Sequence, residues 1–527
     1  MTAVWLTATP PTPNGDLHLG HLAGPYVAVD VLRRYLTAEG ADVVMTTGMD
    51  DSQSYVPVTG LRTGRTGEQV ADFYGSRIAE AWEAAYVRFD RIVMPRRDPD
   101  YVEFVQTFFR QLVDKGAIVP RTRPLPFCRD CDRWLYEAFV NGGCPHCGAS
   151  SNGNACEACG RPNTCGDLRD PRCVACGQAA ELRDCTRLFL PLEPLADQLA
   201  AFWDSVAMPP HLRELCRAMA ADGLPEIAVS HPSDWGVPVP GPPQFEDQRI
   251  FVWLEMAPGY LLESDDSSTG PACGPVQLFG FDNGYFHAVL FPALFMAWDP
   301  DLPLATAFVV NEFYLYEGKK FSTSRGHAVW ARDALAQHGA DVVRRHVLHD
   351  RPNGRQTNFR WRDLERTRDH LEEEWNGWLN RLFAAVADET GGTVPAESPA
   401  GPESEVLLGR LTRLVEELRE AYSPAAFDAR RAVELLDELV RCASDHGYVH
   451  AHEPDPARYR AALSAQLAAA SALASWAAPA LPEGAARLSE ALGLRPARRV
   501  HADALAPPPA GSRLSPPPAP IFGSWPR

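Results

Sequence analysis

The sequence has no excess of positive charge and no long hydrophobic run, and these two absences exclude whole classes of protein. Its 527 residues include 50 Lys and Arg against 68 Asp and Glu, which gives a net charge of −18. An acidic chain is a poor general binder of polyanions, because such binding relies on neutralising phosphates over a wide surface. A basic groove of local extent is still compatible with this balance.

The longest uncharged stretch, residues 461–482, is mostly Ala with Ser, Gln and Pro. It is much less apolar than a membrane-spanning helix requires, so we interpret it as an Ala-rich core helix with Leu463 and Leu467 on one face. The N-terminal residues MTAVWLTATPPTPNGD lack both a positively charged region and a long apolar region. We therefore expect no secretory signal, no membrane partner and a cytoplasmic protein.

Signs of general disorder and of solenoid repeats are also missing. With 45% hydrophobic and 22% charged residues, the composition is that of an ordinary globular protein. Dividing the length by about 150 residues per domain predicts three to four folded units. Only the residues from about 504 onward, which contain two Pro-Pro-Pro runs, are predicted to form a disordered or polyproline tail.

Cysteine, in contrast, is concentrated in one region. Of the 13 cysteines, nine fall between Cys128 and Cys176, and eight of these form four Cys-x-x-Cys pairs: Cys128/Cys131, Cys144/Cys147, Cys156/Cys159 and Cys173/Cys176. Two thiolates separated by two residues can bind one tetrahedral ion from a tight turn, and a second pair completes the shell. We therefore predict two structural zinc ions.

The alternative for these cysteines is a disulfide framework. That framework requires an oxidising compartment, for which the sequence carries no signal. Each closed zinc site could supply ~10 kcal/mol or more of folding free energy, so the segment needs no large apolar core of its own. The sequence leaves open which pairs share an ion and whether Cys165 replaces any ligand.

Strand and helix signals alternate at the N-terminus. Residues 4–7 are predicted to form a short buried strand, followed by a Pro-rich turn, a helix over about 18–36 and a second strand over 42–47. This order is typical of a parallel α/β sheet, whose ligand crevice lies at the carboxyl ends of the strands. His18 and Asp50 both belong to that edge.

The rest of the chain divides by pattern. Helices are predicted over 70–88 and 101–115 before the cysteine region, and strand and turn patterns over 226–326 after it. Beyond about residue 363 the pattern is helical, with helices predicted over 366–387, 405–421, 425–446 and 456–478.

Two short motifs carry chemistry suited to a nucleotide. In His18-Leu19-Gly20-His21, two imidazoles share one face of a helix beside its N-terminus, where phosphate is favoured, and the glycine leaves room for a flat base or ribose. In the loop GKKFSTSRG, residues 318–326, a lysine ammonium can neutralise the charge that develops as pyrophosphate leaves. Taken alone, the first motif could equally be a metal or surface pair and the second a solvated turn.

Together these motifs resemble those of the class I aminoacyl-tRNA synthetases, and the segments between them resemble the methionyl-tRNA synthetase family. Over residues 3–385, HLGH is similar to the family's HIGH signature and KFSTS to its KMSKS loop. TTGMDD, SHPSDWGVPVPG, VWLEMAPGY and YFH resemble its TGTDE, SRD…WGIPVPG, VWFDAPIGY and YFH segments. The resemblance implies a Rossmann-like parallel-sheet catalytic domain split by a zinc-knuckle insertion and followed by an α-helical bundle domain.

The domain boundaries that follow from this resemblance are approximate in sequence but definite in order. We expect the two catalytic halves at 1–116 and 226–330, the zinc-bearing connective insertion at 117–225, a stem-contact segment at 331–370, a helical anticodon-binding-like domain at 371–495 and the Pro-rich disordered tail at 496–527.

The resemblance also assigns roles to individual residues. It implies that His18, His21 and Lys320 are catalytic and that ATP, with Mg²⁺, contacts these three and Gly20, Gly280, Asp282, Lys319, Ser322 and Ser324. It implies that Asp50 pairs with the α-ammonium of the amino acid and that Trp253, Tyr260 and His287 line the side-chain pocket. The alternative for a buried tryptophan is ordinary core packing.

Several positions depart from the family's pattern. Thr323 stands where the loop usually has a second lysine, for which Lys319 is a candidate substitute. Pro10 and Thr12 replace a Leu and a Tyr at the amino-acid pocket, and His231 replaces an Arg. In the helical region, Gly377 and Asp455 fall on two anticodon-reading positions, whereas Arg381 is retained.

The function that the resemblance implies is ATP-dependent activation of an amino acid, with methionine then transferred to tRNA. The family includes both monomers and dimers built through an extra C-terminal domain, and we expect this chain to be a monomer. One alternative is a tRNA-independent ligase of a biosynthetic pathway, for example one that forms a hydrazine by joining the activated amino acid to a hydroxylamine-bearing amino acid. A second alternative is an inactive binding protein, which the presence of His18, His21, Asp50 and Lys320 disfavours.

Overall fold

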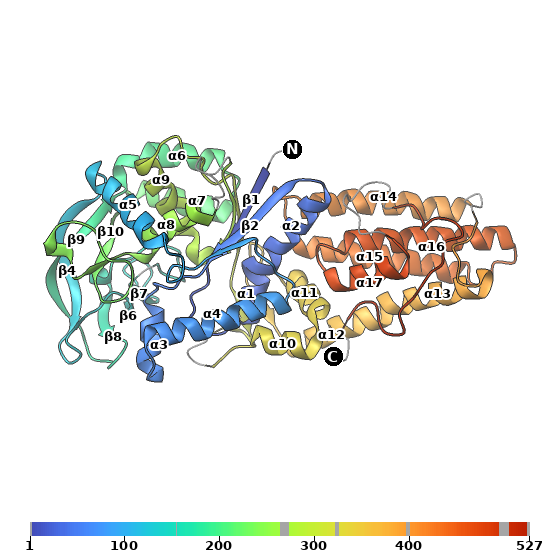
Figure 1. Ribbon diagram of the computed structural model, residues 1–527, viewed down its shortest axis with the longest axis horizontal. Helices are drawn as coiled ribbons and strands as arrows, with labels where there is room; N and C mark the ends of the chain where they lie inside the picture. The colour runs from blue at the N-terminus through green and yellow to red at the C-terminus, as the bar shows by residue number, and fades with distance from the viewer. Residues whose placement is uncertain are drawn as a thin grey trace.

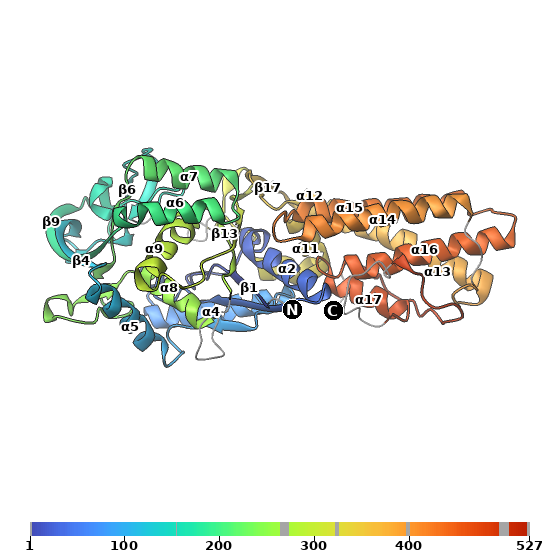
Figure 2. The same ribbon diagram turned by 90° about the horizontal axis from the view of Figure 1, so that it is seen from above.

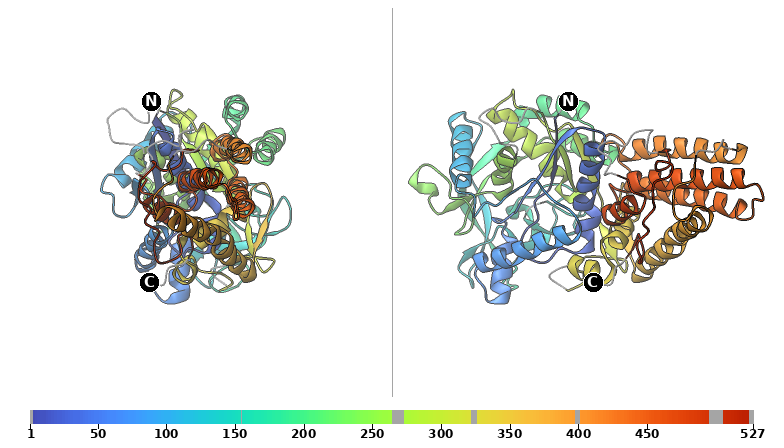
Figure 3. Two further views of the ribbon diagram at one scale, coloured as in Figure 1. Left: turned by 90° about the vertical axis from the view of Figure 1, so that its right-hand side faces the viewer. Right: turned by 45° about the vertical axis from the view of Figure 1, so that its right-hand side comes forward.

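The computed structural model describes residues 3–153, 155–263, 273–321, 326–396, 401–494 and 505–523. The molecule is elongated, with a mixed α/β part at one end and a bundle of long helices at the other (Figure 1). The view from above shows the same division (Figure 2), and the view along the long axis looks down the bundle helices nearly end-on (Figure 3, left). The N-terminal strand lies close to the junction of the two parts (Figure 1).

A five-stranded parallel sheet forms the centre of the α/β part, as the sequence predicts. Its order is β14-β13-β1-β2-β3, with every neighbouring pair parallel. The strands are β1 Ala3–Ala8, β2 Asp42–Gly48, β3 Arg91–Val93, β13 Val276–Gly280 and β14 Ala307–Asn311. Because β1 lies between β2 and β13, the strand order reverses at β1, and the crevice beyond its carboxyl end is where such sheets bind ligands.

The predicted helices that follow β1 and β2 are present. The chain after β1 forms α1 Leu19–His21, the π-helical turn η1 Leu22–Tyr26 and α2 Val27–Ala38, with a kink at Gly24. After β2 come α3 Tyr55–Thr63, α4 Gly67–Ala84 and α5 Tyr101–Asp114. These helices are amphipathic, and α2 buries Val27, Val31 and Leu32 against the sheet.

The prediction of strand and turn structure throughout 226–326 is wrong for two segments. VWLEMAPGY begins helix α8 Val252–Glu263 despite Pro258, and YFH begins a helical run through η6 Phe286–Leu290 and α9 Phe291–Trp298. Every residue from 251 to 260 is buried, so the segment shows no polar face and no 3.6-residue period. Helix and strand cannot be distinguished by pattern in such a fully buried and nearly apolar run.

The cysteine-rich insertion is built on a long antiparallel pair, β4 Val119–Cys128 with β9 Glu181–Pro191. One sheet has the order β10-β9-β4-β5 and a smaller one the order β7-β6-β8. The further elements are β5 Arg133–Trp134, β6 Glu137–Gly143, β7 Ser150–Gly153, β8 Arg169–Cys173, α6 Ala196–Ser205, α7 Pro210–Ala221 and β10 Glu226–Ala228.

Short strands and two helices lead from the sheet to the bundle. They are β11 Ser230–Pro232, β12 Gln248–Ile250, β15 Tyr314–Tyr316, β16 Lys319–Lys320, α10 Ala331–His338, α11 Ala340–His349 and β17 Thr357–Phe359. The bundle comprises α12 Trp361–His370, η8 Leu371–Asn376, α13 Gly377–Thr390, α14 Pro402–Tyr422, α15 Ala429–Val449, α16 Pro456–Trp476 and α17 Pro482–Ala491.

The bundle shares its core with the sheet. One buried apolar cluster runs from Leu6 and Leu278 in the sheet to Leu436 and Leu473 in the bundle. The Ala-rich helix α16 is buried along most of its length, which confirms its interpretation as a core helix. None of the helices in the described ranges is long and apolar enough to cross a membrane.

The prediction of a disordered tail is wrong for residues 505–523. Phe522 is fully buried, and its ring meets that of Trp375 edge-on with centroids 4.9 Å apart. The Asn376 side chain donates to the Phe522 carbonyl at 2.7 Å and accepts from the backbone amides of Ile521 and Phe522 at 3.0 Å each. The prolines therefore form an extended strap that ends in an apolar anchor.

Candidate active site

The turn after β1 brings the two histidines of HLGH together. Their rings are stacked with centroids 3.8 Å apart, and the His18 backbone amide donates to Nδ1 of His21 at 3.1 Å. Burial, with a smaller contribution from Lys320, lowers the pKa of His21 to about 4. Burial, with smaller contributions from His21 and Lys320, holds the pKa of His18 well below its usual value. Both rings are therefore neutral near pH 7, and His21 carries its proton on Nε2.

Gly20 is required by this ring arrangement. A Cβ atom built on Gly20 would lie 2.9 Å from two atoms of the His18 imidazole and 3.5 Å from the Phe321 ring. A side chain at this position would therefore displace the histidine. The space beside Gly20, expected from the sequence to admit a base or ribose, contains the His18 ring in this structure.

The lysine loop folds over the histidine turn from almost 300 residues away. The Phe321 ring stacks on His18 with centroids 4.6 Å apart. The backbone amide of Leu19 donates to the Val329 carbonyl at 3.0 Å, and that of Ala331 donates to the Leu17 carbonyl at 2.8 Å. The predicted meeting of these two motifs is therefore present, although Ser322, Thr323 and Ser324 lie outside the described residues.

Lys320 points toward the crevice side of this loop. Its ammonium lies 4.2 Å from the centroid of the Phe313 ring and forms an ion pair with Glu157. Lys320 follows Lys319 in the short strand β16, where successive side chains point to opposite faces. Only three lysines occur in the sequence, the third being Lys115, so two of the three lie together in this loop.

Asp50 lies just beyond the end of β2, as expected, and is buried. Thr12 Oγ1 donates to its Oδ2 at 2.7 Å and Gln53 Nε2 donates to the same oxygen at 3.3 Å. Its second oxygen, Oδ1, has no hydrogen-bond partner among the described residues. Burial raises the pKa of Asp50 to about 7. A cationic group that pairs with Oδ1 would supply the missing partner and restore the charged form.

Trp253, Tyr260 and His287 gather in one aromatic cluster. The Trp253 ring stacks on Phe286 with centroids 3.7 Å apart, and the ring of His287 lies 5.9 Å from Tyr260 and 6.4 Å from Trp253. Nδ1 of His287 bonds Gln277 Oε1 at 3.1 Å, and burial lowers the pKa of His287 to about 3. A small cavity of about 20 Å³ adjoins Tyr260 and His287. The surroundings suit an apolar, uncharged side chain.

Gly280 ends strand β13 and Asp282 follows it, at the same edge of the sheet. A Cβ on Gly280 would lie 2.6 Å from Asp282 Oδ1, so a side chain at this position would displace the Asp282 carboxylate. Burial raises the pKa of Asp282, and Lys320 opposes the shift. The turns after β1 and β13 therefore face each other across the crevice where the strand order reverses.

The structure decides how the cysteine pairs combine. The outer pairs form one cluster and the inner pairs another: Cys128, Cys131, Cys173 and Cys176, and Cys144, Cys147, Cys156 and Cys159, with all sulfurs of a cluster within 4.8 Å of one another. A tetrahedral Zn²⁺ with Zn–S bonds of about 2.3 Å requires sulfurs roughly 3.8 Å apart, so both clusters fit zinc.

Residues with a left-handed backbone conformation close the turns of these clusters. Gly148, Gly160 and Gly177 each follow the second cysteine of a pair with φ between 71° and 79°, and Asp132 follows Cys131 with φ 47°. Cys165 belongs to neither cluster. Its thiol donates to the Gly153 carbonyl at 3.5 Å, and burial raises its pKa to about 11. Cys165 is therefore a buried thiol in the core of the insertion.

Sequence reasoning missed a group of buried polar residues behind Asp50. Glu137 and Glu255 are almost fully buried, and burial raises the pKa of each to about 8. His231, which replaces an Arg of the family's pattern, accepts at Nδ1 from NH1 of Arg187 at 3.3 Å and approaches Glu137 at 3.8 Å. The guanidinium of Arg187, a residue of strand β9, therefore lies beside the position where the family's pattern has its own Arg. Glu255 stands within VWLEMAPGY and was accessible to motif comparison, whereas Glu137 and Arg187 lie in no motif.

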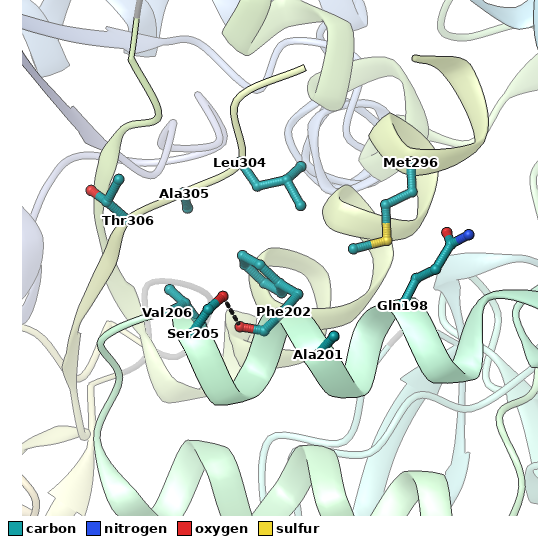
Figure 4. Close-up of a pocket in the computed structure, with 9 residues that line it drawn as sticks. All are labelled: Gln198, Ala201, Phe202, Ser205, Val206, Met296, Leu304, Ala305 and Thr306. Atoms are coloured by element: carbon teal, nitrogen blue, oxygen red, sulfur yellow. Dashed lines mark hydrogen bonds between the residues drawn. The ribbon is translucent and has the colours of Figure 1, made fainter. Parts of the chain in front are cut away.

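A pocket of about 500 Å³, lined by none of the site residues above, lies between α6, the end of α9 and the chain before β14 (Figure 4). It is lined by Gln198, Ala201, Phe202, Ser205, Val206, Met296, Leu304, Ala305 and Thr306. None of these side chains is ionisable, and the Ser205 hydroxyl is bonded to the Phe202 carbonyl at 2.9 Å. The pocket therefore offers no catalytic group.

Comparison with known proteins identifies the family of the chain. The sequence model of a family described as tRNA synthetases class I (M) matches residues 4–383. The methionine–tRNA ligase of Thermomicrobium roseum is 30% identical over 503 residues, which cover 92% of this chain and 86% of that protein. The methionine–tRNA ligase of Pyrobaculum islandicum is 29% identical over 502 residues, with 90% and 87% covered.

Solved structures give the same relationship at the level of fold. A structure of Mycobacterium tuberculosis methionyl-tRNA synthetase bound by methionyl-adenylate superposes with a TM-score of 0.82 and 22% identity. The match covers 99% of this chain and 100% of that one. The likeness of fold therefore extends across both the α/β part and the helical bundle.

Proposed function

The chain belongs to the methionyl-tRNA synthetase family of the class I tRNA synthetases, and from that premise we propose that it activates methionine with ATP and transfers the methionyl group to tRNA. The observation that carries the proposal is the contact between the histidine turn and the lysine loop, where Phe321 stacks on His18. The histidine turn comes from the N-terminal half of the catalytic region and the lysine loop from its C-terminal half. Both carry groups that suit phosphate, and they meet at one crevice.

In the first step the carboxylate of the amino acid attacks the α-phosphate of ATP and pyrophosphate leaves. Neutral His18 and His21 donate hydrogen bonds to the reacting phosphate, and Lys320 neutralises charge on the departing phosphates. Asp50 holds the α-ammonium, while Trp253, Tyr260 and His287 surround the side chain. Mg²⁺ bound with ATP would supply further positive charge. The residues proposed to contact the nucleotide are Gly280, Asp282, Lys319, Ser322 and Ser324.

In the second step the adenylate passes its amino acid to tRNA. We assign the stem contact to residues 331–370 and the anticodon contact to the helical region 371–495. Each of the two four-cysteine clusters would hold one zinc ion, which stabilises the insertion by closing its turns. The relatives reported above are named methionine–tRNA ligases, and they give no support to the alternative of a tRNA-independent, hydrazine-forming ligase.

The test is ATP–pyrophosphate exchange across a panel of amino acids, followed by charging of purified tRNA. We expect exchange with methionine and charging of methionine tRNA. His21→Ala and Lys320→Met should each lower the exchange rate by roughly 10²- to 10³-fold, the usual cost of one lost donor. Lys115→Met, which removes the lysine outside the site, should leave it unchanged. Equal rates in all three variants would contradict the proposal.

A further inference from the structure

The inner cysteine cluster, formed by Cys144, Cys147, Cys156 and Cys159, reaches the lysine loop. Glu157 lies between Cys156 and Cys159, and its carboxylate forms the ion pair with the Lys320 ammonium described above. The two side chains are about half exposed, with 57% of Glu157 and 43% of Lys320 accessible. A residue of the insertion thus holds the cation that the proposed reaction needs for the phosphates of ATP.

The turn that carries Glu157 packs against helix α7 of the insertion and against Phe281 of the catalytic part. A Cβ on Gly160 would lie 2.9 Å from Leu215 and 3.3 Å from Phe281, so the turn packs closely on both. Arg161, one residue further, pairs with Asp222 at 2.5 Å. The backbone amide of Cys156 donates to the Arg161 carbonyl at 2.9 Å. These contacts place Glu157 over Lys320 independently of the ion pair itself.

Lys320 has acidic neighbours on this side of the crevice. Asp282 is buried close enough for Lys320 to oppose the rise of its pKa, and Glu157 acts on the same group in the opposite sense. Lys320 also lies close enough to His18 and His21 to contribute to the lowering of their pKa values. The triphosphate of an ATP molecule that reaches the two histidines must therefore either bind Lys320 together with the Glu157 carboxylate or displace that carboxylate from the ion pair.

We propose that Glu157 is a positioning residue for Lys320: its carboxylate holds the ammonium over the crevice in the nucleotide-free enzyme and is exchanged for the outer phosphates when ATP binds. No bond is made or broken in this exchange, in which one anionic partner of Lys320 replaces another. The inference rests on the proposed function for the identity of the nucleotide. The ion pair itself can be tested without any turnover.

The first experiment measures lysine reactivity in the nucleotide-free full-length protein. Acetic anhydride acylates the lysine amine, and a carboxylate that holds the amine in an ion pair limits the access of the reagent, so the pair with Glu157 should protect Lys320. With only three lysines in the sequence, mass spectrometry can follow Lys320 against Lys319 and Lys115. Glu157→Gln should raise the reactivity of Lys320 roughly two- to fivefold, the range expected for an exposed ion pair, and leave the other two unchanged.

The matched control is Asp222→Asn, which breaks the other ion pair of the same turn without touching Lys320. It should leave the reactivity of Lys320 at the wild-type value. Glu157→Asp, which keeps the charge on a shorter side chain, should restore part of the protection. The same increase in Glu157→Gln and Asp222→Asn would overturn the proposal, because it would mean that the turn had loosened. No increase in Glu157→Gln would also overturn it.

The second experiment measures pyrophosphate exchange as a function of ATP concentration. Because Glu157 competes with phosphate for Lys320, Glu157→Gln should lower the KM for ATP roughly two- to fivefold and change kcat by less than about twofold, with Asp222→Asn unchanged. A higher KM for ATP in Glu157→Gln would overturn the proposal that the phosphates of ATP replace Glu157 as the partner of Lys320. If the wild-type protein catalyses no exchange with any amino acid, the proposed function fails, while the lysine reactivities still decide the role of Glu157.

Discussion

Asp50 is a single residue whose surroundings prepare it for a cation. Two donors, Thr12 and Gln53, bond one of its oxygens and leave the other without a partner among the described residues. Desolvation outweighs these bonds and raises its pKa to about 7. Thr12 stands where the family's pattern has a Tyr. In this chain the threonine hydroxyl donates directly to the Asp50 carboxylate, and no aromatic ring is present at this position.

The raised pKa of Asp50 predicts the pH dependence of amino-acid binding. The α-ammonium requires the carboxylate form, which is lost as the pH falls through about 7. We expect kcat/KM for the amino acid to fall about tenfold per pH unit below that value, measured by pyrophosphate exchange between pH 5.5 and 8.5. If the inflection instead lies near 8 and disappears in Glu137→Gln or Glu255→Gln, the titrating group is one of those acids.

At the scale of elements, the zinc turns were predictable and their partnership was not. Cys-x-x-Cys spacing identifies a metal turn locally, but β6, β7 and β8 decide which turns meet. The turn at the end of β4 lies beside the one at the end of β8, although the two strands belong to different sheets, and the two inner turns lie beside each other. A nested arrangement follows, with Cys165 left in the core.

Paired serine substitutions test this nested arrangement by zinc content. The wild-type chain should bind two zinc ions, measured by mass spectrometry of the metal. Cys144→Ser with Cys156→Ser removes two ligands from one cluster and should leave one ion. Cys128→Ser with Cys156→Ser removes one ligand from each cluster and should weaken both.

Cys165→Ser is the control for these variants and should retain two ions, because its sulfur lies in neither cluster. If Cys144→Ser with Cys156→Ser lost both ions while Cys128→Ser with Cys156→Ser kept one, the clusters would be paired differently from the structure.

At the scale of the whole molecule, buried ion pairs and the strap join the bundle to the catalytic part. Arg344 is fully buried, pairs with Asp30 of α2 at 2.7 Å and donates to the carbonyls of Pro479 and Ala480 at 2.9 and 2.7 Å. Gly484 of α17 packs so closely that a Cβ there would lie 2.2 Å from the Phe522 ring. The two parts and the strap therefore form one packed unit.

Truncating the anchor of the strap should destabilise the protein. Phe522→Ala removes a fully buried ring, and such changes lower the free energy of unfolding by roughly 3–5 kcal/mol. Urea unfolding followed by circular dichroism measures the loss. Pro518→Ala, at an exposed position of the same strap, is the control and should change stability by less than about 0.5 kcal/mol. Equal stability of both variants would mean that the strap is not anchored in solution.

The far end of the bundle offers a surface for the tRNA contact proposed above. Arg381 lies over the exposed ring of Tyr448 at 4.6 Å and donates to the Ser444 hydroxyl at 3.0 Å. Asp455, at a position where the family's pattern has a base-stacking Trp, instead accepts from the Ala457 amide and caps α16. Tyr448 is therefore an aromatic ring available to stack on a base.

Tyr448→Ala should weaken tRNA charging without affecting activation. Base stacking on an aromatic residue contributes enough for roughly a tenfold rise in the KM for tRNA. Pyrophosphate exchange should be unchanged, because it takes place in the sheet crevice. Val406→Ala, at an equally exposed apolar position on α14, should alter neither rate. A rise in KM that is the same for both variants would contradict a specific contact at Tyr448.

Local patterns in the sequence predicted the parallel sheet, the long helices before the insertion and in the bundle, the zinc turns and the two phosphate-binding motifs, because periodicity, turn residues and ligand spacing act over a few residues. Tertiary packing decided the rest. It made the fully buried 251–260 segment helical, where no polar face distinguishes helix from strand, and it anchored a proline-rich strap that composition alone predicts to be disordered. It brought Arg187, Glu137 and Glu157 from the insertion to the catalytic crevice, since the positions of residues far apart in the chain depend on how strands pair and helices pack.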